Sequence, residues 1–175
     1  MFNIIQTWLQ KHSLSTERYG DELRFKHSDT RSSILVMGDK LPNRIAEPRS
    51  PILSAFYSQC AGASIGNGHI IIGALVRDGL NLSHGYRLPD VNEMRQTAAR
   101  LDMQDPVGAE VFMMEASWLF IYGMVPNSDQ MVRFDREFDT YETVSGIESV
   151  LNDWWQIVVA DDETCWPKKA TSDKQ

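Results

Sequence analysis

The sequence contains few of the residues on which metal sites and catalytic sites depend. It has two cysteines, Cys60 and Cys165, and four histidines among 175 residues. No C-x-x-C, H-x-x-x-H or H-E-x-x-H spacing occurs, so the sequence predicts no metal site and no cofactor. We expect Cys60 to be a small buried apolar group and Cys165 an incidental exposed thiol, because disulfides are rare in the cytosol.

Long hydrophobic runs are also missing. No apolar run approaches the ~20 residues needed to cross a bilayer. Residues 2–12 lack the basic start, the continuous apolar segment and the small-residue cleavage site of a secretory signal. These two absences exclude a membrane partner and predict a cytoplasmic protein.

Basic residues are outnumbered. The 17 lysines and arginines oppose 24 aspartates and glutamates, which gives a net charge of -7. Such a balance repels phosphate backbones, so nucleic acid is excluded as a partner. A basic protein would be steered toward the same surface.

Four segments show the spacing of apolar residues that is typical of amphipathic helices. Ser50-Pro51 and Ser145-x-x-Glu148 are typical starts of a helix, because the serine can cap the first turn. A similar arrangement at Asp90 and Glu93 starts a third. The predicted helices cover 2–12, 51–57, 90–101 and 145–158.

The strand prediction rests on short apolar runs rich in β-branched and aromatic residues. Residues 13–30 are polar and are expected to be irregular. Gly62, Gly66 and Gly68 are expected to end a helix and to lead into a central strand. The glycines do not match a phosphate-binding loop, because the expected order is helix before and strand after. The predicted strands cover 34–37, 69–76, 111–115, 118–124 and 130–134.

Together these elements predict an α+β fold with a mostly antiparallel sheet and helices packed on one face. We expect a single domain over 1–166 with an N-terminal helical extension. Residues 167–175 are polar and have nothing to bury, so they are expected to form a flexible tail.

Acidic and aromatic residues near the C-terminal strands are the candidates for binding a partner. If the chain is extended after residue 134, Asp135, Glu137 and Asp139 lie on one side and form an acidic stripe. Trp155 is adjacent to Trp154 and therefore lies off the buried stripe of the last helix, where it could contact a partner.

His84, in a polar loop, completes the set of candidate partner-binding residues. An alternative hypothesis is a small hydrolase-like enzyme that uses these carboxylates together with His84. Glu110 and Glu115 frame another strand. Paired carboxylates serve as acid and base only when burial separates their pKa values, and we expect these groups to be solvated strand ends.

The order of elements resembles that of the SUKH superfamily. The resemblance is carried by residues 52–57 leading through Gly62 and Gly66 into the apolar strand. Further residues that carry it are the strand 118–123, the strand 131–135 and the closing helix 145–154. It covers about 45–158.

The resemblance implies an α+β fold without known catalytic residues. In bacteria such domains bind and neutralise a cognate protein toxin, so it implies an immunity protein that is not an enzyme and acts as a monomer or weak homo-oligomer. A third hypothesis is an oligomeric structural or assembly protein.

Overall fold

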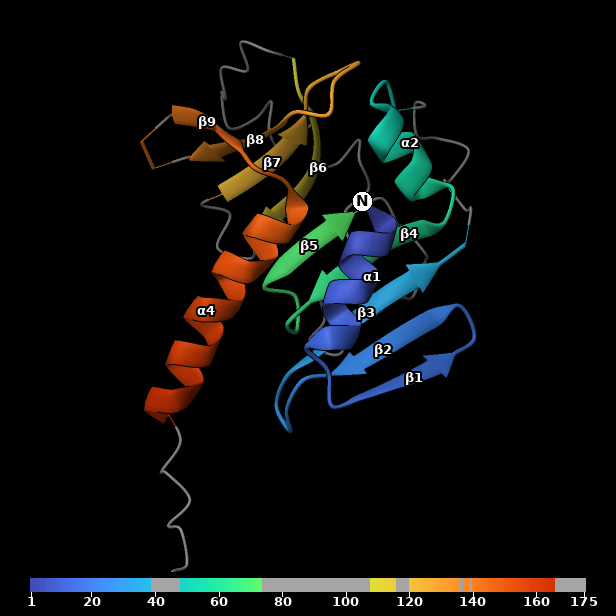
Figure 1. The fold of residues 1–175 in the computed structure, drawn as a ribbon, viewed down its shortest axis with the longest axis vertical. Helices are drawn as coiled ribbons and strands as arrows, with labels where there is room; N and C mark the ends of the chain where they lie inside the picture. The colour runs from blue at the N-terminus through green and yellow to red at the C-terminus, as the bar shows by residue number, and fades with distance from the viewer. Residues whose placement is uncertain (39–47, 74–107, 116–119, 136, 139, 166–175) are drawn as a thin grey trace, which may run out of the picture.

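The computed structural model contains three helices and nine strands among the residues that it describes (Figure 1). Those residues are 1–38, 48–73, 108–115, 120–135, 137–138 and 140–165, with side chains described up to residue 157. The helices are α1 (Phe2–Lys11), α2 (Pro51–Tyr57) and α4 (Ile147–Cys165). The strands are β1 (Ser15–Tyr19), β2 (Glu22–Lys26), β3 (Ser32–Met37), β4 (Cys60–Ile65), β5 (Ile70–Gly73), β6 (Glu110–Glu115), β7 (Phe120–Met124), β8 (Met131–Asp135) and β9 (Thr140–Val144).

All nine strands belong to one antiparallel sheet, in which each strand pairs with its neighbours in chain order. This confirms the predicted α+β character and the antiparallel sheet. The described helices include none that is long and apolar enough to cross a membrane.

The helix predictions hold where the structure describes them. Helix α1 buries Phe2, Ile5, Trp8 and Leu9, the stripe expected from their spacing. At the start of α2, the Ser50 hydroxyl accepts a hydrogen bond from the Leu53 amide at 3.4 Å. The predicted helix at 90–101 lies outside the described residues.

Four strands were missed or misread. The segment 13–30 is not irregular, because it contains the hairpin of β1 and β2. Gly62 does not end a helix but lies inside β4, which pairs with β3. Strand β9 was not predicted at all. Strands β1 and β9 are largely exposed, so they lack the apolar alternation by which a half-buried strand is recognised.

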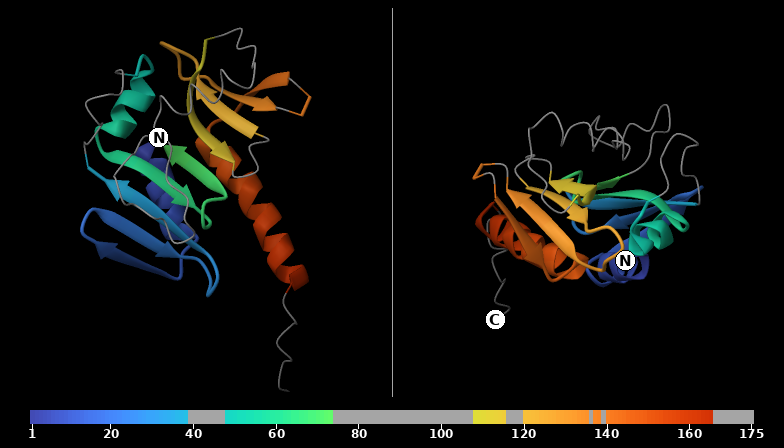
Figure 2. Two further views of the ribbon diagram at one scale, coloured as in Figure 1. Left: turned by 180° about the vertical axis from the view of Figure 1, so that it is seen from behind. Right: turned by 90° about the horizontal axis from the view of Figure 1, so that it is seen from above.

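The sheet separates two groups of buried side chains. Alternate residues of β3 and β5 point to opposite faces, so that Leu35 and Ile72 join one group while Val36 and Ile71 join the other. Buried side chains of α1, α2 and α4 belong to the first group. Seen from above in Figure 2, these three helices lie on the same side of the sheet. Helix α1 is therefore part of the core.

A buried carboxylate joins α2 to the middle of the sheet. Glu110, at the start of β6, is 2% exposed and accepts hydrogen bonds from the Arg49 amide at 3.0 Å and the Ser50 amide at 2.8 Å. These amides precede the first turn of α2 and would otherwise lack a partner in the interior. The prediction that Glu110 is a solvated strand end is therefore wrong.

Candidate functional site

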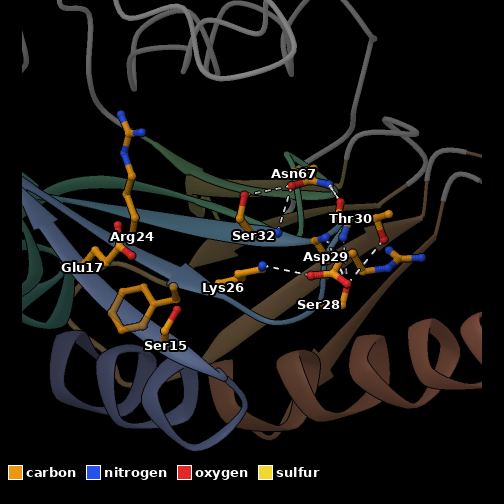
Figure 3. Close-up of a pocket in the computed structure, with 11 residues that line it drawn as sticks. Ser15, Glu17, Arg24, Lys26, Ser28, Asp29, Thr30, Ser32 and Asn67 are labelled. Carbon is orange, nitrogen blue, oxygen red and sulfur yellow. Dashed lines mark hydrogen bonds and ion pairs between the residues drawn. The ribbon is translucent and has the colours of Figure 1, made fainter.

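A hollow lies near each end of the sheet. The hollow near β1 has a volume of about 360 Å³ and is lined mainly by polar side chains of β1, β2 and the segment that leads into β3. Figure 3 shows how these side chains lie. Four of the lining residues, 28–31, come from the segment that joins β2 to β3, and Asn67 comes from the turn between β4 and β5.

Most of the polar groups in this hollow bond to one another. Lys26 forms an ion pair with Asp29 at 2.9 Å, and the Asn67 side-chain oxygen accepts from both the amide and the hydroxyl of Ser32 at 3.0 Å. The Ser28 hydroxyl accepts from the amides of Thr30 and Arg31. These bonds fix the loop between β2 and β3, so the hollow is explained by local structure.

The second hollow is a groove of about 310 Å³ between the last strands and α4. We call it the β9 groove. Its lining residues come from strands β6 to β9 and from α4. The groove is lined by Glu115, Phe120, Arg133, Glu142, Thr143, Val144, Ser145, Ser149, Val150, Asp153, Trp154 and Ile157.

A half-buried carboxyl group lies at the end of β6 in this groove. The Tyr122 hydroxyl donates a hydrogen bond to Glu115 at 2.7 Å. Burial raises the pKa of Glu115, while the hydrogen bond from Tyr122 and the nearby charge of Arg133 act in the opposite direction. Burial and the adjacent carboxylate also raise the pKa of Tyr122. Glu115 is half-buried and hydrogen-bonded, so the expected solvated strand end is only partly correct.

Arg133 lies on the same face of β8. Its guanidinium carbon is 4.6 Å from the centre of the Phe120 ring, and it forms an ion pair with Glu142 of β9. Arg133 and Glu142 are directly opposite each other in the pairing of β8 with β9. The Nε of Arg133 is buried and has no hydrogen-bond partner among the described residues.

Large apolar side chains are exposed in the groove, on β9 and in the turn before β9. Ile157 on α4 is 63% exposed within the groove, and Phe138 in the turn before β9 is 70% exposed. Tyr141 of β9 is 48% exposed, and its ring lies 6.3 Å from that of Phe134 on the opposite face of the sheet from the groove. Large exposed apolar residues beside a charged groove are typical of a surface that binds a partner.

The predicted acidic stripe takes a different form. Strand β8 ends at Asp135, and residues 137–138 form a turn. The Asp135 carboxylate accepts from the amides of Glu137 at 2.9 Å and Phe138 at 3.3 Å, which closes this turn. The backbone is therefore not extended through Glu137, and the Asp135 carboxylate stabilises the turn. Asp139 and His84 lie outside the described residues.

Trp155 packs between elements of the N-terminal half. It is partly buried, and its ring lies within 5.8 Å of the rings of Trp8, His12 and His27. This position connects α4 to α1 and to the end of β2. The structure thus gives Trp155 an internal packing role, and binding by its remaining exposed surface stays a prediction.

Cys60 is buried and free, as expected from its sequence context. Burial raises the pKa of its thiol to about 12. The described residues contain no group of three potential ligands that could hold a metal ion.

Sequence reasoning missed the pairs Glu115–Tyr122 and Arg133–Glu142. The second pair depends on the hairpin of β8 and β9, and a register centred on residues 136–139 would have placed Arg133 opposite Glu142. The separation of Arg133 and Glu142 in the sequence is therefore that of an opposed pair, but the pair can be inferred only once β9 is recognised as a strand.

Comparisons with protein-family models, with curated proteins and with solved structures found no match to this chain.

Proposed function

We propose that this protein is a non-catalytic binding module that acts as an immunity protein. It neutralises a cognate protein toxin by covering part of the toxin's surface. The observation that carries the proposal is the β9 groove, which combines an exposed apolar side chain, that of Ile157, with an excess of carboxylates. The chemistry of the groove is that of a contact surface, since most of its ionisable groups pair with a neighbour.

The charge of the groove supports a basic partner. Its lining includes three carboxylates, Glu115, Glu142 and Asp153, and one guanidinium, that of Arg133. The three carboxylates outnumber the one guanidinium, so the groove has an excess of negative charge that attracts cations. The net charge of -7 has the same sign. The negative charge of the groove and that of the whole chain both speed the capture of a basic protein.

The α+β character of the fold is what the resemblance to the SUKH superfamily implies. A bacterial immunity protein of this kind binds its toxin in the cytoplasm, as a monomer or weak homo-oligomer, without a cofactor or nucleic acid. Occlusion requires a rigid contact surface, and strands β7 and β8 give the groove rigid support because most of their side chains are buried.

Co-purification from the native cell tests the proposal. Tagged wild-type protein is compared with Asp153→Lys, which reverses an exposed charge in the groove, and with Glu148→Lys, which reverses an exposed charge on the same helix outside it. We expect one basic protein to be retained in stoichiometric amount by the wild type and by Glu148→Lys, and to be reduced with Asp153→Lys.

The retained protein is then purified and expressed alone. We expect it to arrest growth, and co-expression of the wild type to restore growth. The proposal is wrong if no stoichiometric partner is found at low and moderate salt, or if the retained protein is harmless.

A further inference from the structure

Among the described residues, no strand pairs with the outer edge of β9, which lies beside the β9 groove. Strand β9 pairs with β8 on one side, and it is the final strand in the sheet order of the described residues. In an antiparallel strand, the backbone groups of every second residue point away from the existing neighbour. These groups can form a ladder with another extended chain.

We propose that β9 receives an extended segment of a basic protein partner as a tenth strand of the sheet. This inference rests on the proposed function and specifies how the partner binds. The incoming segment has basic side chains on its groove face and apolar side chains on its other face.

The two faces of β9 determine that pattern. Glu142 points to the groove, where Asp153 of α4 also lies. Tyr141 points to the other face, beside Phe134. A strand added to β9 places its side chains about 5 Å from those of β9 in directly opposite positions. A lysine or arginine opposite Glu142 thus lies beside that carboxylate and faces the groove that Asp153 also lines, and an apolar residue opposite Tyr141 covers its exposed ring.

Strand β9 is less protected against such pairing than the opposite edge. The five residues of β1 include two charged side chains, Glu17 and Arg18, whereas β9 has one, Glu142. Charged side chains on an edge strand oppose the approach of another strand.

Charge complementarity selects a basic partner over a second copy of this chain. Two copies paired through β9 in antiparallel register about Glu142 would place these two carboxylates opposite each other, and each copy has a net charge of -7. Like charges directly opposite each other destabilise strand pairing.

Synthetic peptides test the proposal on the full-length protein. The probe is a short peptide in which lysine and valine alternate. One control has the same side chains but methylated backbone nitrogens, which cannot donate to a ladder, and another has glutamate in place of lysine. We expect the lysine peptide to bind, the methylated peptide to bind about tenfold more weakly, and the glutamate peptide not to bind.

Amide hydrogen exchange then locates the contact. We expect amides of Thr140–Val144 to gain protection with the lysine peptide and not with the methylated one. The charge reversal Asp153→Lys should weaken binding about fivefold, whereas Glu17→Lys on β1 should leave it unchanged.

Equal binding of the methylated peptide, protection elsewhere in the protein, or self-association through β9 would overturn the proposal. If the cellular partner is still captured in that case, the proposed function survives without strand addition. If the peptide protects β9 but no cellular partner exists, strand addition stands and the immunity function fails.

Discussion

The two ends of the sheet are built alike but use their polar groups differently. Each ends in a short, exposed strand and has a hollow beside it. Near β1, the polar groups bond mainly to one another and fix the loop between β2 and β3. Near β9, a buried Nε of Arg133 lacks a partner among the described residues, and Ile157 is exposed.

This difference shows why the hollow of larger volume is not the better candidate site. A set of polar groups that satisfies itself gains little from a ligand, because each bond to the ligand replaces an existing one. A groove with exposed apolar surface, and with more carboxylates than guanidinium groups, gains from burial and from charge pairing.

Trp154 lines the β9 groove and packs against Gly66, the residue before Asn67 of the hollow near β1. A substitution at Gly66 is expected to have the largest effect on stability. Gly66 has a φ of +61°, and a Cβ atom built there would lie 2.3 Å from the Trp154 ring. We expect Gly66→Ala to lower the free energy of unfolding by about 3 kcal/mol, because strain at positive φ adds to the displacement of the ring. Urea denaturation measures this change.

Gly20 provides a matched control. It also has a φ of +61°, but an added Cβ would meet nothing within 4 Å. We expect Gly20→Ala to cost about 1 kcal/mol, the strain alone. Equal losses for the two variants would show that the contact with Trp154 does not hold α4 in place, and that the β9 groove is independent of the β1 end.

The next largest effect is expected within the groove. Tyr122→Phe removes the donor to Glu115 and leaves a half-buried carboxylate with one hydrogen bond fewer. We expect a loss of about 1.5 kcal/mol in the free energy of unfolding near neutral pH. Tyr141→Phe changes an exposed side chain of β9 and should stay within about 0.5 kcal/mol of the wild type. A loss as large for Tyr141→Phe would contradict this explanation.

The sequence predicts the buried parts of the fold better than the parts proposed to bind. The apolar spacing of residues such as Ile5 and Leu9, or Leu151 and Trp154, indicates α1 and α4, because one face of each helix enters the core. The runs of β3, β5, β6, β7 and β8 are recognisable for the same reason.

The edge strands and the groove depend on contacts between distant residues. The exposed β1 and β9 lack the apolar alternation of a half-buried strand, although β9 is rich in β-branched and aromatic residues. The groove unites Glu115, Arg133 and Asp153 from three elements, and only the antiparallel order of the strands brings them together. Asp135 was identified as an acidic side chain, but its hydrogen bonds to the turn amides could not be inferred without the hairpin.

Acid is expected to affect the two ends in opposite directions. In the β1 half, burial lowers the pKa of His27, whose Nδ1 donates to the His12 carbonyl at 2.8 Å and whose Nε2 then accepts from the Ser33 hydroxyl at 2.6 Å. Burial, Lys11 and His27 lower the pKa of His12. The folded protein therefore binds fewer protons than the unfolded chain, and these groups reduce stability as the pH falls through about 6.5.

Glu115 has the opposite sign. Because its pKa is raised from 4.5, the folded protein holds this proton at a pH where the unfolded chain has lost it. Its contribution to stability therefore increases as the pH falls toward 4.5 and is lost as the pH rises through the folded-state pKa. Denaturation at a series of pH values should show a smaller acid loss for His12→Phe and a larger one for Glu115→Gln. If stability depends on pH in both variants as it does in the wild type, the assignment of the acid response to His12 and Glu115 is wrong.

The smallest effect on stability is expected for Glu142→Gln, and this variant separates folding from binding. The ion pair of Glu142 with Arg133 is solvent-accessible, with 57% of the Glu142 side chain and 36% of the Arg133 side chain exposed. Exposed ion pairs contribute little, so urea denaturation should show a loss of about 0.5 kcal/mol that disappears at high salt. The same substitution removes the carboxylate that the lysine of an added strand would meet. Binding of the lysine–valine peptide should therefore weaken more than folding does, and an equal effect on both would assign Glu142 to the structure of the hairpin alone.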